Sequence, residues 1–180
     1  MTGPVPPYAL FVLVEDVDAR YLSDALTRAY KGNFEAAWEQ YLVTGNHEDA
    51  PKKLKNAYPE GTKAPVPDDF RSPFVRKTPE ECALWLQDAP EDVALNREYF
   101  LFMDEFSRTE DTIQICRVKH DAETGYFHVE YFPELTGDST IQIATSLGSK
   151  FDDALERYQC RRMRDGKPDR SQGIPFDQTA

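Results

Sequence analysis

Three side chains with complementary proton chemistry lie on one face of a predicted strand, Gly125 to Phe132. Every second residue of a strand points to the same side, which places Tyr126, His128 and Glu130 together. A carboxylate beside an imidazole can orient the ring and raise its pKa, and a phenol can donate a hydrogen bond to a developing oxyanion. The set predicts proton transfer on a small carbonyl-bearing molecule, of the lyase, isomerase or cyclase type, with no cofactor. The simpler interpretation is a sheet face in contact with water, where these residue types are common.

Carboxylates at strand ends form a second group of candidates. Asp16 and Asp18 follow the apolar run ALFVLV, and Asp104 lies near the end of another predicted strand, Tyr99 to Phe106. If the two strands are parallel neighbours, these acids meet at the carboxyl edge of the sheet, where open α/β folds usually place their sites. Their oxygens could then hold a hydrated Mg²⁺, which makes Asp16, Asp18 and Asp104 an alternative metal site. The simpler interpretation assigns them to helix capping and turns.

Other kinds of catalytic site have little support in the sequence. Cys82, Cys116 and Cys160 are odd in number and lack the spacing that zinc sites need, so we interpret them as reduced thiols of a cytoplasmic protein. The chain contains no GxSxG elbow and no glycine-rich phosphate-binding pattern. No organic cofactor is therefore predicted.

Charge and hydropathy limit the classes of partner. The 180 residues include 32 Asp and Glu against 21 Lys and Arg, a formal net charge of -11. Such a surface repels phosphate backbones and anionic lipids, so nucleic acid and membranes are not expected partners. Basic residues gather between Arg157 and Arg170, where they could bind an acidic partner or the acidic body of the protein itself.

The first third of the chain predicts a strand followed by two helices. ALFVLV (residues 9–14) is continuously apolar, as in a strand covered on both faces. Asp16 or Asp18 can cap a helix that ends at Lys31-Gly32. A second helix is predicted from Asn33 to Gly45. Its apolar face comprises Phe34, Ala37, Trp38, Tyr41 and Leu42.

Prolines interrupt every candidate element between residues 44 and 77, which predicts a long irregular connection. Loops of this length in a compact domain are lids, binding loops or passive insertions. Thr78, Pro79 and Glu81 then supply the cap, the first-turn proline and the capping-box acid of a new helix.

The remaining sequence predicts four strands and a last helix. The strands are 99–106, 112–120, 125–132 and 140–144, with a hairpin between the second and third, and the helix starts at Ser149. The order of elements predicts an α/β fold with α+β character, a mixed sheet of about five strands packed with about four helices. We expect a single domain over residues 1–160, with the loop at 44–77, and a polar basic tail at 161–180.

Some of these segments resemble a family of small bacterial and fungal proteins known only as a domain of unknown function. The similarity rests on ALFVLV with the following acids, on FLFMDE, and on FHVEYFP, IQIATS and FDDAL in the last third. Its most specific points are Asp16 and Asp104, and the segment 145–149 departs from the turn expected before the last helix. The resemblance implies a single α/β domain and brings no known activity.

Two hypotheses about function follow. In the first, a pocket between the face of Tyr126, His128 and Glu130 and the 44–77 loop, acting as a lid, performs acid-base chemistry on a small-molecule ligand. In the second, the protein is a non-catalytic interaction or regulatory module of acidic surface. An enclosed pocket reached by His128 favours the enzyme, whereas a face open to solvent favours the module.

Overall fold

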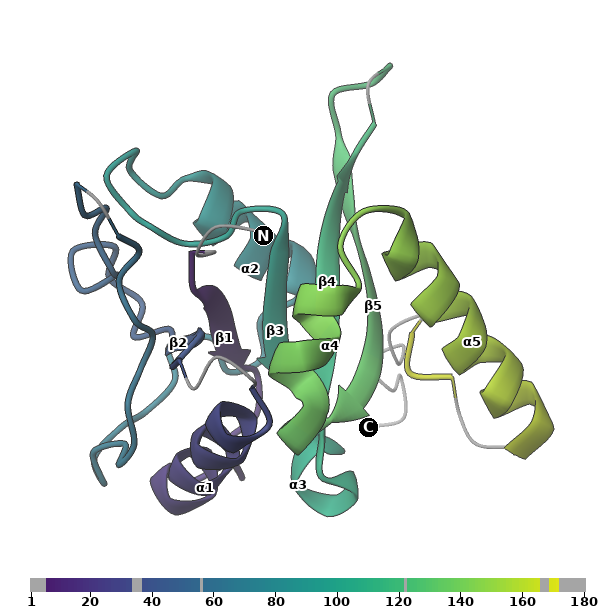
Figure 1. Cartoon of the computed structure of the whole chain (residues 1–180), viewed down its shortest axis with the longest axis horizontal. Coiled ribbons are helices and arrows are strands. Elements are labelled where there is room, and N and C mark those ends of the chain that lie inside the picture. The colour runs from purple at the N-terminus through teal and green to yellow at the C-terminus, as the bar shows by residue number, and fades with distance from the viewer. Residues whose placement is uncertain (1–5, 34–36, 56, 122, 166–168, 172–180) are drawn as a thin grey trace.

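A mixed five-stranded sheet runs through the protein, in the order β2-β1-β3-β4-β5 (Figure 1). The computed structural model describes residues 6–33, 37–55, 57–121, 123–165 and 169–171. The strands are β1 (Tyr8–Val12), β2 (Gln40–Leu42), β3 (Tyr99–Met103), β4 (Thr112–His120) and β5 (Phe127–Leu135). β1 pairs in parallel with β2 and β3, while β3–β4 and β4–β5 are antiparallel. The sequence-based prediction of a mixed α+β sheet is confirmed.

β1 lies inside the sheet because its residues are apolar on both faces. All five are buried, and alternate side chains enter two separate cores. Leu10 packs in the core that includes Leu22, whereas Phe11 packs edge-on against Phe74 and Phe100 in the other. The prediction of an interior strand is confirmed.

Helices cover both faces of this sheet. The core containing Leu10 also receives side chains of α1, α4 and α5, and the core containing Phe11 receives α2 (Figure 1). A single turn of helix, α3, joins β3 to β4, and the 3₁₀ turn η1 precedes α4. The helical elements are α1 (Ala19–Lys31), α2 (Pro79–Gln87), α3 (Ser107–Glu110), η1 (Thr136–Asp138), α4 (Ser139–Thr145) and α5 (Ser149–Asp165).

Two helix starts form as the local sequence predicts. The Asp18 carboxylate accepts a hydrogen bond from the Tyr21 backbone N–H at 2.8 Å and caps α1. Thr78 and Glu81 form the reciprocal capping box of α2, with distances of 2.8 and 3.2 Å. Each interaction satisfies N–H groups that a helix leaves free at its first turn.

The predicted helix after Asn33 is wrong where the structure describes it, since residues 40–42 form strand β2; residues 34–36 lie outside the described part. Tyr41 and Leu42 enter opposite cores, as an extended backbone requires. The segment pairs with β1 on one side and accepts hydrogen bonds from the Gly61 and Thr62 N–H groups on the other. These hydrogen bonds outweigh the helical spacing of its apolar residues. Local propensity is a weak signal when such pairing is available.

The predicted strand at residues 140–144 is also wrong, because this segment is helix α4. Its buried residues are Ser139, Thr140 and Ile143, which recur at helical spacing. Gln40 of β2 donates hydrogen bonds to the Ser139 and Thr140 hydroxyls at 2.8 and 3.1 Å. These buried polar partners hold the helix against the sheet edge.

Residues 44–55 and 57–77 contain no helix and no strand of the sheet, and the connection packs at the β2 side of the molecule. The Ser72 hydroxyl donates to the Val12 carbonyl oxygen at 2.6 Å, and the Arg76 N–H donates to the Leu13 carbonyl oxygen at 2.9 Å. The Val66 N–H donates to the Ser23 hydroxyl of α1 at 2.8 Å. The connection therefore covers the carboxyl end of β1.

At the opposite side of the molecule, α5 continues to Asp165, so the expected tail begins as helix. Residues 169–171 then return to the body of the protein, where Arg170 is buried. Among the residues described, no helix combines the length and apolar character needed to cross a bilayer.

Candidate functional site

The start of β5, which carries His128, is open to solvent. β5 is the edge strand farthest from β2, and the tip of its hairpin with β4 projects from the body (Figure 1). The His128 side chain is 58% exposed and Tyr126 is 78% exposed. The 44–77 connection, bonded to β1 and α1, is not a lid over this face. Within the described residues, the 44–77 connection and the His128 side chain therefore form no enclosed pocket between them.

Glu130, the third residue of that set, has a structural partner. Its Oε1 lies 3.5 Å from His128 Nε2, so the structure does bring these two together. Its Oε2, however, accepts hydrogen bonds from the buried guanidinium of Arg117, which also pairs with Asp152. Burial acts to raise the Glu130 pKa, but the bonds and charge of Arg117 outweigh it and lower the pKa. The Glu130 carboxylate is therefore mainly a partner of Arg117 in this ion-pair network.

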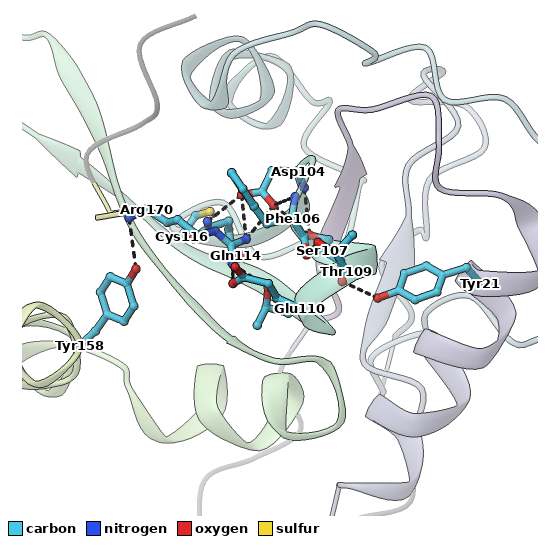
Figure 2. Close-up of polar contacts among 11 residues, drawn as sticks. Tyr21, Asp104, Phe106, Ser107, Thr109, Glu110, Gln114, Cys116, Tyr158 and Arg170 are labelled. Atoms are coloured by element: carbon cyan, nitrogen blue, oxygen red, sulfur yellow. Dashed lines mark hydrogen bonds and ion pairs between the residues drawn. The ribbon is translucent and has the colours of Figure 1, made fainter. Parts of the chain in front are cut away.

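The alternative metal site is not assembled. β1 and β3 are parallel neighbours, as the proposal required. Asp18 caps α1 and lies 3.3 Å from Arg108, whereas Asp104 accepts hydrogen bonds from Arg170 and Gln114 (Figure 2). Asp16 contributes its backbone oxygen to Arg108 at 2.6 Å. Within the described residues, no group of three His, Cys, Asp or Glu side chains could hold a metal ion.

The topology points instead to the carboxyl end of β1. From this strand the chain passes through α1 to β2 on one side, and it returns through α2 on the opposite face to β3 on the other side. The carboxyl end of such a central strand is the switch point at which open α/β sheets bind ligands.

A cavity of about 490 Å³ lies at this point, within the size range of small-ligand sites. We call it the β1 crevice. One wall follows β1 into α1 and the other is the loop 68–75. The lining residues are Val12, Val14, Glu15, Val17, Asp18, Ala19, Asp68, Phe70, Arg71, Ser72 and Val75.

Backbone hydrogen bonds fix the two walls relative to each other. Val12 and Leu13 accept the bonds from Ser72 and Arg76 described above. The Ser72 hydroxyl also accepts from the Phe74 N–H at 3.1 Å, which sets the turn of the loop. Phe74 is buried against Phe11 in the core. The crevice is thus anchored to the sheet.

The crevice has apolar surfaces and an acidic rim. The lining residues carry three carboxylates, those of Glu15, Asp18 and Asp68, and one guanidinium, that of Arg71. That guanidinium donates to the carbonyl oxygens of Asp68 and Phe70, at 3.3 and 2.7 Å. Outside the lining, Arg76 lies 3.4 Å from Glu15 and Arg108 lies 3.3 Å from Asp18. The Tyr21 backbone N–H and, secondarily, Arg108 lower the pKa of Asp18.

The sequence indicated half of this site. Asp18 was expected at the carboxyl edge of the sheet, and the proline-rich connection was recognised as a candidate binding loop. Asp68 and Phe70 were missed because no spacing pattern joins them to β1. The available signal was the proline-rich segment itself, and only the fold shows which strand it covers.

Fold and crevice together define an α+β domain with a partly apolar crevice, lined by three carboxylates, at a topological switch point. Comparison of the chain with protein-family models, curated proteins and solved structures finds no match. The resemblance to a domain of unknown function stays a prediction.

Proposed function

We propose that this protein is a small-molecule-binding domain whose ligand is an organic amine with a compact apolar body, bound in the β1 crevice. The observation that carries the proposal is the coincidence of cavity and topology. The crevice opens at the carboxyl end of β1, where a fold of this kind converges on a ligand.

Charge in the lining supports a cationic ligand. The lining guanidinium, that of Arg71, already serves the backbone of its own loop. Glu15 and Asp18 lie beside two further guanidinium groups, those of Arg76 and Arg108, at 3.4 and 3.3 Å. Asp68 forms no ion pair among the described residues, so an ammonium group at the rim gains most from this carboxylate, while an anion is repelled. Val12, Val17 and Phe70 provide apolar contact for the rest of the ligand.

Binding has better support than proton transfer. The lowered pKa of Asp18 suits charge recognition rather than the donation of a proton at neutral pH. The lining contains no His, Cys or Lys among the residues described. Proton transfer at His128 has less support, because its ring is exposed on a projecting hairpin.

The test compares three ligands of similar size and different charge: benzylamine, benzyl alcohol and benzoate. We expect benzylamine to bind with a Kd on the order of 1 mM, as usual for a ligand of so few atoms, and benzoate to bind at least tenfold more weakly. The Kd values are measured by two-dimensional NMR titration. Equal binding of benzoate and benzylamine contradicts the proposal.

Adjacent aspartates provide a matched pair of variants. Asp68 lines the crevice, whereas its neighbour Asp69 is exposed and does not. Asp68→Asn should weaken benzylamine about 2- to 5-fold, the range of an exposed charge pair. Asp69→Asn should leave the Kd unchanged within error. Equal effects of the two substitutions would show that only the overall charge of the protein matters.

A further inference from the structure

A carboxylate with many polar contacts, that of Asp104, lies just after the end of β3 (Figure 2). The Asp104 side chain is 14% exposed, and its orientation is fixed by neighbours. Its Oδ1 accepts from the Ser107 hydroxyl at 3.2 Å, and its Oδ2 accepts from the Gln114 amide at 2.9 Å. We call the surroundings the Asp104 pocket. It comprises Asp104, Phe106, Glu110, Thr112 and Gln114.

The pocket holds a guanidinium, that of Arg170, 66 residues away along the chain. One terminal nitrogen donates to both oxygens of Asp104, at 2.7 and 2.9 Å. The other donates to Glu110 at 2.9 Å and to the Thr112 hydroxyl at 2.8 Å. The guanidinium carbon lies 5.0 Å from the centre of the Phe106 ring. Carboxylates, a hydroxyl and an aromatic ring are the groups that suit a planar, forked cation.

Arg170 does not use all the hydrogen-bonding groups of the pocket. Gln114 is 1% exposed, and its Oε1 has no donor among the described residues. The amide cannot simply be turned over, because its nitrogen is needed by the Asp104 carboxylate. The Nε of Arg170 is likewise buried with no acceptor in the described part of the chain. A buried acceptor without a donor costs free energy, so the site is complete only with a further donor.

Apart from the Arg170 guanidinium, the segment that carries Arg170 is attached to α5. The Arg170 backbone N–H donates to the Tyr158 hydroxyl of α5 at 3.1 Å, and Gln159 of α5 donates to the Ser171 hydroxyl at 3.1 Å. Within the described residues, the hydrogen bonds of segment 169–171 to β3, α3 and β4 come from the guanidinium alone. The Arg170 guanidinium therefore reaches the Asp104 pocket from a short segment that is bonded to α5.

We propose that the Asp104 pocket is a guanidinium-binding site that the protein fills with its own Arg170 and that accepts an arginine side chain of a partner peptide in its place. A ligand whose backbone is free of α5 can place its Nε–H or peptide N–H on the Gln114 oxygen, which Arg170 leaves unpaired. This proposal is independent of the β1 crevice.

The experiment removes the internal occupant and supplies the ligand from solution. N-acetyl-arginine amide is titrated into wild type and into Arg170→Ala, with the Kd from NMR and the thermal unfolding midpoint as readouts. We expect the variant to bind at least tenfold more tightly than wild type, because the empty pocket has no internal competitor. Ligand should also raise the midpoint of the variant. Arg161→Ala, which changes an exposed arginine of α5, should bind no better than wild type.

Further ligands and a second variant distinguish recognition of the guanidinium from general electrostatic attraction. N-acetyl-lysine amide should bind the Arg170→Ala variant at least fivefold more weakly, since an ammonium has one nitrogen where the guanidinium places two, one on Asp104 and one on Glu110 and Thr112. Free arginine should also bind more weakly, because its carboxylate approaches Asp104 and Glu110. Adding Asp104→Asn to Arg170→Ala should abolish binding.

Three results would each overturn the proposal. The first is the absence of saturable binding of N-acetyl-arginine amide to Arg170→Ala, and the second is an equal affinity of wild type for this ligand. The third is an equal affinity of Arg170→Ala for the lysine ligand or for free arginine. If Arg170→Ala is unfolded without ligand, Arg170→Gln retains much of the side-chain length and is tested in the same way. A failure of the ligand to raise the midpoint of either variant also overturns it.

Discussion

Arg117 offers the sharpest test of how the β4–β5 face is built. Its side chain is 8% exposed, and it bonds to Glu130, to Asp152 and, at 3.1 Å, to the Gly148 carbonyl oxygen. Its guanidinium lies 4.5 Å from the centre of the Phe151 ring. Arg117→Met keeps most of the apolar stem and removes the charge, so it isolates the electrostatic contribution.

The expected loss of unfolding free energy depends on the groups that lose their partner in Arg117→Met. Removing one partner of a fully buried ion pair costs about 3–5 kcal/mol. Glu130 is 20% exposed and keeps Lys119 at 3.3 Å, which reduces the cost. The lost bond to Gly148 adds to it, so we expect a loss of about 3 kcal/mol of unfolding free energy. With a urea dependence of about 2 kcal/mol per molar, the midpoint falls by about 1.5 M.

Lys119→Met is the matched control, because Lys119 lies on the same strand and contacts the same carboxylate. Its side chain is 52% exposed, so the expected loss is about 0.5 kcal/mol or less. Equilibrium urea unfolding, followed by circular dichroism, measures both variants. If the loss of unfolding free energy in Arg117→Met is within about 1 kcal/mol of the loss in Lys119→Met, the ion-pair network of Arg117 does not stabilise the fold as a buried network should.

Three further predictions concern the remaining candidate residues. Asp18→Ala should cost about 1 kcal/mol because it removes the cap of α1, whereas Asp16→Ala, which leaves its backbone contact in place, should cost less than about 0.5 kcal/mol in the same unfolding assay. His128→Ala should change neither stability by more than about 0.5 kcal/mol nor the Kd for benzylamine, since its ring is exposed; a large loss of either would restore a role for it. The pKa values of Glu130 and Asp152 are lowered in the folded state, so their stabilisation is present above the unfolded-state pKa, near 4, and is lost as the pH falls through the folded values. Between pH 6 and 3, the unfolding free energy measured in urea should therefore fall less steeply in Arg117→Met than in wild type. An equal fall of the unfolding free energy in both proteins would contradict this.

Elements with local signals could be predicted from the sequence. ALFVLV predicts a strand buried on both faces, and the Thr78 capping box predicts the start of α2, because these patterns contain their own physical cause. The hairpin of β4 and β5 follows in the same way from two strand patterns separated by a short turn.

Elements that depend on distant partners could not. Residues 40–42 form a strand because β1 is beside them, and α4 is held by Gln40, about 100 residues away. The candidate sites could not be predicted from the sequence for the same reason. Asp68 reaches the crevice through the bonds of its loop to β1, and Arg170 reaches Asp104 from beyond the last helix. Sequence spacing carries no information about such contacts.

A crystal structure of the protein soaked with benzylamine would show whether the β1 crevice binds a small organic cation. We expect the ring against Val12, Val17 and Phe70, with the ammonium nitrogen within about 3.5 Å of a carboxylate oxygen of Glu15, Asp18 or Asp68. An empty crevice at saturating ligand, or benzylamine bound only elsewhere on the protein, would contradict the account.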